Sequence, residues 1–77
     1  MEKGSGESTY QEVLENNNFY WNSKQEWWER KQGFGRKDTI EVMFKCLFIM
    51  HRGKKKVHDN FIETFEEFKE VFSEFYR

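Results

Sequence analysis

The residues of this 77-residue chain that could carry chemistry are one cysteine, two histidines and many charged side chains. Nucleophilic catalysis by cysteine needs a thiolate with a histidine base within hydrogen-bond reach. Cys46 stands in an apolar run, and His51 follows it by five residues, which puts the two on different faces of a helix. We therefore expect a buried, inert thiol. A single cysteine also forms no internal disulfide, which favours a reducing compartment.

Other kinds of reactive site are equally poorly supported. No group of histidines and cysteines has the spacing of metal ligands, and Gly33-Phe34-Gly35 lacks the longer pattern of a phosphate-binding loop. The carboxylates of residues 63–74 are close together and expected to be solvated, whereas general acid–base catalysis needs a carboxylate in a partly dry pocket. The sequence predicts no enzyme, no metal and no cofactor.

Cations gather in two clusters, at residues 30–37 and 52–56, and aromatic residues lie nearby in the sequence. Basic grooves lined with aromatic side chains bind single-stranded nucleic acid, because bases stack on the rings. Nucleic-acid binding is therefore the alternative function. The aromatic residues are Trp21, Trp27, Trp28 and Phe34, and the basic residues are Arg30, Lys31, Arg36, Lys37, Arg52, Lys54, Lys55 and Lys56.

Three observations weigh against that alternative. Acidic segments outnumber the basic ones, and the net charge is −1. The helix expected after Lys37 is too apolar to lie in a DNA groove. Residues 54–56 would follow the C-terminus of that helix, where cations complement the helix dipole. Arg36 and Lys37 lack this explanation because they precede a helix N-terminus, so they are the better candidates for contacting an anionic partner.

Hydrophobic spacing predicts the elements that would position these residues. Residues 39–52 form a broad apolar stripe that begins at a capping-box pattern and ends at Gly53, which favours a helix over the alternative of a short strand at residues 42–50. Residues 19–32 predict a second helix with its aromatic residues on one face. A second interpretation begins that helix at Ser23 and leaves residues 19–21 extended.

The C-terminal stretch carries phenylalanines at alternating steps of four and three, the spacing of a helix seam that packs along its length. These are Phe61, Phe65, Phe68, Phe72 and Phe75. We expect this seam to form the floor of the core or the face of a homodimer.

The expected fold is all-α, a small bundle of three main helices with a short N-terminal helix. The short helix is expected to begin at Ser8 and to stop at residues 16–18. Residues 1–7 are expected to be a disordered lead, and residues 8–77 a single helical domain.

Phe48 falls within the one polar stripe of the helix expected at residues 39–52. Either the N-terminal segment covers it, or it anchors a partner. With so few signs of catalysis, the sequence favours a non-enzymatic protein–protein interaction module that inhibits or adapts a larger cellular machine. The expected contact residues are Phe48, Trp27, Trp28, Arg36 and Lys37, with an acidic face of Glu66, Glu67, Glu70 and Glu74 as an electrostatic guide.

The general character of the chain resembles that of small viral or phage host-takeover proteins, because it is short, rich in Lys, Glu, Asn and Phe, and free of proline. No motif accompanies this likeness. The polar N-terminus and the lack of an apolar run long enough for a bilayer predict a protein of the cytoplasm, or of a host cytoplasm, that does not bind membranes.

Overall fold

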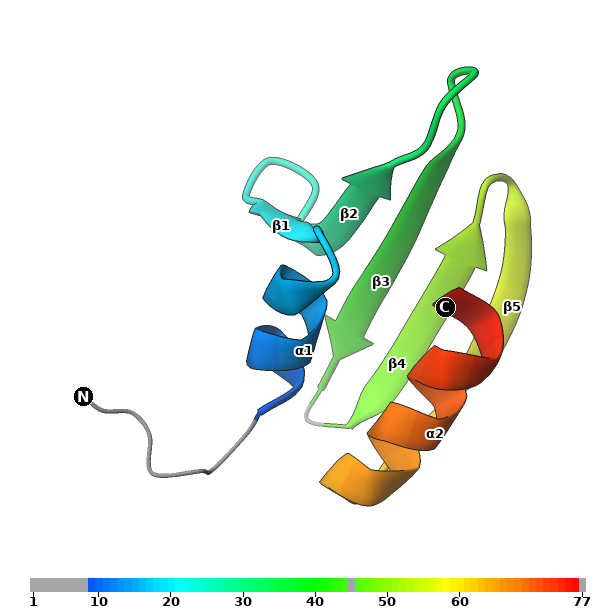
Figure 1. The fold of residues 1–77 in the computed structure, drawn as a ribbon. Helices are drawn as coiled ribbons and strands as arrows, with labels where there is room; N and C mark the ends of the chain where they lie inside the picture. Colours follow the sequence, from blue (N-terminus) through cyan, green and yellow to red (C-terminus); the bar gives the residue numbers. More distant parts are fainter. Residues whose placement is uncertain (1–8, 45, 77) are drawn as a thin grey trace.

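The computed structural model describes residues 9–44 and 46–76 and shows one antiparallel sheet with two helices on one of its faces (Figure 1). The sheet has five strands in the order β1-β2-β3-β4-β5, so each strand pairs with its neighbour in the chain. The elements are α1 (Tyr10–Asn16), β1 (Tyr20–Asn22), β2 (Trp27–Lys31), β3 (Lys37–Met43), β4 (Leu47–Arg52), β5 (Lys55–Phe61) and α2 (Phe65–Tyr76).

The prediction of an all-α helical bundle is therefore wrong. The central helix expected at residues 39–52 is the hairpin of β3 and β4, with a turn at Phe44, whose φ is 56°. Alternation explains the error, because Ile40 and Val42 face the helices opposite Met50 and Phe48. On a helical wheel the same residues imitate one broad apolar face. The strand alternative for residues 42–50 was closer to the observed structure.

The aromatic helix expected at residues 19–32 is also wrong, since these residues form the β1–β2 hairpin. The side chain of Asn22 holds the turn by accepting hydrogen bonds from the backbone N–H groups of Lys24 and Gln25. Trp27 and Trp28 are consecutive in a strand and so point to opposite faces of the sheet. The extended segment at residues 19–21 in the second interpretation agrees with β1.

The short N-terminal helix is present as α1 and ends, as expected, at the asparagines. Its N-cap is Thr9, whose hydroxyl accepts a hydrogen bond from the N–H of Glu12 at 3.3 Å. The disordered lead predicted for residues 1–7, and the cap predicted at Ser8, lie outside the described residues.

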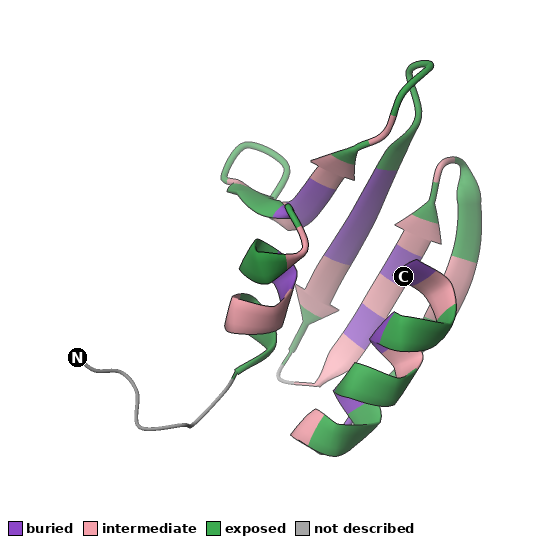
Figure 2. Ribbon diagram, in the orientation of Figure 1, coloured by how far each residue is buried: buried purple, intermediate pink, exposed green. Residues whose placement is uncertain are grey.

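The seam helix exists but begins four residues later than expected. Phe61 is the last residue of β5, and Thr64 caps α2 by accepting from the N–H of Glu67 at 3.1 Å. The side chains buried against the sheet are Phe68, Phe72 and Tyr76, with Phe65 and Phe75 partly buried (Figure 2). Four of the five seam phenylalanines therefore contribute to the core, whereas Phe61 is exposed, and the homodimer stays a prediction.

Phe48 belongs to this core. It is 4% exposed, and its ring lies 5.4 Å from that of Phe68 and 5.6 Å from that of Tyr10 in α1, between ring centroids. The N-terminal helix thus covers Phe48, as in the first of the two interpretations. Phe48 and the buried Trp28 are not exposed to a partner, which corrects their assignment as contact residues.

The C-terminal end of α2 is tied to the sheet by polar contacts. The Tyr76 hydroxyl donates to the backbone carbonyl of His51 at 2.9 Å and lies 3.2 Å from that of Thr39. Arg30 donates to the Tyr76 carbonyl at 3.2 Å, and Arg52 to the Phe75 carbonyl at 2.7 Å. These arginines satisfy helix carbonyls that have no partner within the helix and complement its negative dipole end.

A core truncation tests this packing. We expect Phe68→Ala to lower the free energy of unfolding by about 3–5 kcal/mol, because it removes a buried ring that contacts both β4 and the rest of α2. The matched control is Phe44→Ala, which removes an exposed ring and should change stability by about 0.5 kcal/mol or less. Urea titrations of both variants provide the measurement, and equal effects would contradict the core assignment.

Candidate functional site

The topology brings the two basic clusters of the sequence to one end of the sheet. β2 and β4 run in the same direction because each is antiparallel to β3, so the loop after β2 and the turn after β4 lie at the same end. The first of these carries Arg36, and the second carries Gly53 and Lys54. Side chains from both surround a hollow of about 1080 Å³, which we call the basic hollow.

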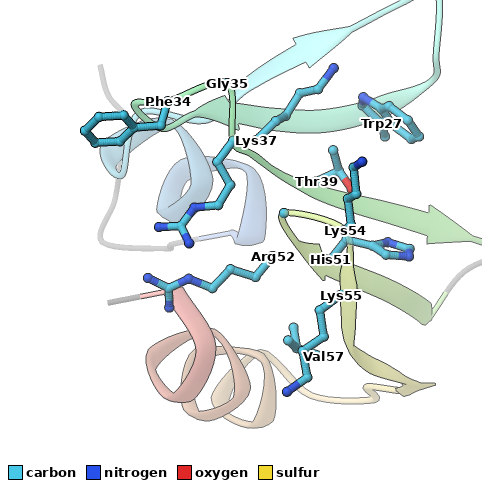
Figure 3. A pocket seen from close by; sticks show the side chains of 12 residues that line it. Trp27, Phe34, Gly35, Lys37, Thr39, His51, Arg52, Lys54, Lys55 and Val57 are labelled. Atoms are coloured by element: carbon cyan, nitrogen blue, oxygen red, sulfur yellow. The ribbon is translucent and has the colours of Figure 1, made fainter.

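The basic hollow has five cations and no carboxylate among its lining residues. The cations are Arg36, Lys37, Arg52, Lys54 and Lys55, and the other lining residues are Trp27, Phe34, Gly35, Thr39, His51, Gly53 and Val57 (Figure 3). Trp27, Thr39 and His51 belong to three neighbouring strands, on the face of the sheet that the helices leave uncovered. Concentrated positive charge beside an accessible indole suits an anionic ligand that also has a planar group.

Gly53 is needed where the two loops meet. Its φ is +66°, and a Cβ added there would lie 3.2 Å from the Cγ and Cδ atoms of Arg36. The aliphatic part of Arg36 therefore lies directly over the glycine, while the Gly53 N–H donates to the Lys37 carbonyl at 2.9 Å. These contacts hold the cations of the first loop beside those of the second.

Glu29 orients the tryptophan of the hollow. Its carboxylate accepts hydrogen bonds from the Tyr20 hydroxyl (2.5 Å), the Asn22 amide (3.1 Å) and the Trp27 indole N–H (2.9 Å), and Lys37 lies 3.6 Å away. The side chain is only 4% exposed although no helix covers this face. Hydrogen bonds from Tyr20 and then Trp27 lower the pKa of Glu29 from 4.5 to about 2. The charged carboxylate fixes the indole between β1 and β3.

Two lysines face each other at the end of the sheet, and the Glu29 carboxylate lies beside one of them, Lys37. Lys31 and Lys37 are directly opposite each other in the β2–β3 pairing, and both are exposed. Directly opposed like charges destabilise a sheet, and the ion pair of Lys37 with Glu29 offsets part of this repulsion. Lys31 lies next to the basic hollow without lining it.

Two of the predicted basic residues have structural roles instead. Arg30 lies on the helix face, where it donates to Asp38 at 2.9 Å and covers the ring of Phe19 at 4.7 Å. Lys56 forms an ion pair with Asp59 at 2.8 Å. The hollow thus gathers five of the eight cations proposed for nucleic-acid binding and leaves out these two and Lys31.

The acidic face predicted for the last helix is present on the outside of α2, away from the sheet (Figure 2). Its members are all exposed: Glu66, Glu67, Glu70 and Glu74. Lys69 pairs with Glu66 at 3.3 Å. Positive and negative surfaces therefore occupy different parts of the molecule, the hollow at the loop end of the sheet and the acidic face on the helix layer.

Cys46 lies in the turn between β3 and β4 and is half-buried, so its placement within a helix was wrong. Sequence reasoning missed Glu29, because a lone glutamate among polar residues gives no sign of burial. It named Phe34 only as a nearby aromatic, although its position between two glycines could have indicated an exposed loop tip.

Acid titration tests the role of Glu29. A carboxyl whose pKa is lowered on folding stabilises the protein above its unfolded value of 4.5, and this contribution is lost as the pH falls toward 2. We expect Glu29→Gln to be less stable than the parent at pH 6, with the difference shrinking between pH 4.5 and 2. Urea midpoints across this range are the measurement.

A second variant, Tyr20→Phe, removes the hydrogen-bond donor that lowers the pKa of Glu29 most. The pKa of Glu29 should then lie closer to 4.5, so that its contribution to the free energy of unfolding is lost over a narrower pH range. A stability difference between parent and Glu29→Gln that stays constant from pH 6 to pH 2 would contradict the assigned network.

None of the helices within residues 9–44 and 46–76 is long and apolar enough to cross a membrane. Comparisons with protein-family models, with curated proteins and with solved structures give no match.

Proposed function

We propose that this chain is a non-enzymatic module that binds single-stranded nucleic acid in the basic hollow. The observation that carries the proposal is the convergence of five cations from two loops around Trp27, with no carboxylate lining the site. Phosphates would lie against the cations, and a base would stack on the indole.

The fold removes two of the three objections that the sequence raised. No apolar helix follows Lys37, because that segment is strand β3. Residues 54–56 follow a strand and not a helix C-terminus, so the helix dipole no longer explains their charge. The third objection, the acidic excess, is met by its location, since four of the acids lie on the outer face of α2. There they would repel a strand and confine it to the hollow.

A single strand suits the site better than a duplex. Trp27 lines the hollow, where an unstacked base could reach it, whereas the bases of a duplex already stack on each other. A duplex would present its phosphates to the basic rim and leave the indole unused. We therefore expect tighter binding of single strands.

Protein binding is the second candidate, and the exposed acidic face of α2 favours it. In this role the module would inhibit or adapt a larger machine in the cytoplasm, or in a host cytoplasm, with Arg36 and Lys37 contacting an acidic partner. The two candidates differ in what the hollow recognises, which is phosphate with bases in the first and a carboxylate-rich polypeptide in the second.

Salt dependence measures the number of phosphate contacts. Binding of a fluorescent oligothymidylate, followed by anisotropy from about 0.05 to 0.2 M salt, should weaken with a log–log slope of up to about −3.5, at roughly −0.7 per neutralised phosphate for five cations. We expect Arg36→Ala combined with Lys37→Ala to bind more weakly and to make the slope shallower by about 1.4.

The matched control is Lys24→Ala combined with Lys69→Ala, which removes the same charge from the β1–β2 turn and from α2. This variant should leave both affinity and slope close to those of the parent. Absence of oligonucleotide binding at low salt would reject the proposal. Equal binding of polyglutamate and oligothymidylate would favour the acidic protein partner.

A further inference from the structure

Phe34 is the most exposed large apolar side chain in the described part of the protein. Its relative exposure is 110%, at the tip of the loop between β2 and β3. Its φ is 64°, a left-handed conformation that is rare for bulky residues, and the flanking Gly33 and Gly35 have nothing within 4 Å of an added Cβ. The fold therefore gains no packing from this ring, which stands free beside the basic hollow.

Phe34 and Trp27 lie on opposite sides of the hollow. Figure 3 shows the rings of Trp27 and His51 on one side of the sheet end, and the side chains of Phe34 and Arg52 on the other. Arg36 and Lys37 follow Phe34 in the same loop and line the hollow with both rings, and the Lys37 Nζ lies 5.9 Å from the centre of the Trp27 ring. Two aromatic rings are thus separated by cations, in the order ring, positive charge, ring.

From this order we propose that Phe34 is a second stacking residue, and that the strand bound in the hollow crosses the end of the sheet between the two loops. One base stacks on Trp27 at the uncovered face, the phosphates that follow lie against Arg36 and Arg52, and a later base stacks on Phe34. This inference rests on the proposed function and adds the path of the strand and a contact that depends on the base.

Stacking with a base explains why an exposed phenylalanine stands at position 34, whereas phosphate binding by the cations does not. A ligand held only by its phosphates gains nothing from Phe34, because the ring carries no charge. A base has an apolar face that covers the ring and removes it from water. The Phe34 side chain is fully exposed, so that a flat group can approach the ring.

The test uses the full chain and three substitutions of Phe34. With oligothymidylate, Phe34→Ala should weaken binding roughly 5- to 150-fold, the range expected for the loss of one stacked base. Phe34→Trp should retain parent affinity or improve it, whereas Phe34→Leu should bind as weakly as Phe34→Ala. All three should keep the parental salt slope, because no cation is changed.

The control protein is Phe44→Ala. Phe44 is 83% exposed with φ 56°, so it matches Phe34 in chemistry, exposure and backbone conformation, but it lies in the turn between β3 and β4. That turn is at the other end of the sheet, so this variant should bind like the parent. The control ligand is an abasic oligonucleotide of equal length. The parent and Phe34→Ala should bind it with equal affinity, because it has no base to stack on the ring.

The outcomes separate this inference from the proposed function. Parental affinity in Phe34→Ala, with binding still weakened in the Arg36 and Lys37 double variant, would overturn the stacking role and leave the hollow as the binding site. Equal losses for Phe34→Ala and Phe44→Ala would overturn it as well. Parental binding by Phe34→Leu would show that the ring is replaceable by any apolar group, which contradicts stacking. Absence of oligonucleotide binding would overturn both proposals.

Discussion

The contact of Tyr76 with the two central strands is the interaction on which the rest of the structure depends. The residue is 1% exposed, and its hydroxyl reaches the backbone carbonyls of Thr39 and His51. Burial raises the pKa of this hydroxyl, so the neutral, donating form is kept. The same contact fixes α2 on one face of the sheet and, on the other face, sets the strand positions from which Thr39 and His51 line the basic hollow.

Two arginines in this region have different roles: Arg30 serves the core, and Arg52 serves both the core and the hollow. Arg30 is committed to the core, where it joins Asp38, the ring of Phe19 and the end of α2. Arg52 donates one hydrogen bond to α2 and still lines the hollow, because a guanidinium has further donors in its planar group. The packing of α2 and the charge of the hollow are therefore coupled through Arg52. Glu29 has the corresponding role on the uncovered face, where it fixes Trp27 without joining the hollow.

The two helices could be predicted from the sequence because their signals are local. Asparagines end α1, and threonine with glutamate begins α2, whose phenylalanines have helical spacing. The β3–β4 hairpin could not be predicted from the sequence, because its apolar residues also fit a helical stripe. In addition, Phe44 in its turn has a backbone conformation usually taken by glycine or asparagine. The irregular pairing between Met50 and His51 further disturbs the alternation that would indicate a strand.

The basic clusters were visible in the sequence, but their convergence was not, since it follows from the direction of β2 and β4 in the sheet. Separating Arg30 from Lys31 required the face of each strand residue, and recognising Glu29 required the positions of Tyr20 and Asn22. These are tertiary facts. Residue types alone indicated the chemistry of the site, while the pairing of strands decided which residues belong to it.

The most direct test of the central claim is an NMR titration of the ¹⁵N-labelled protein with oligothymidylate. If the two loops form one site, backbone shifts should concentrate in residues 33–39 and 51–55 with the same concentration dependence, and the Trp27 indole N–H should move with them. Shifts confined to one loop, or centred on the outer face of α2, would contradict the account.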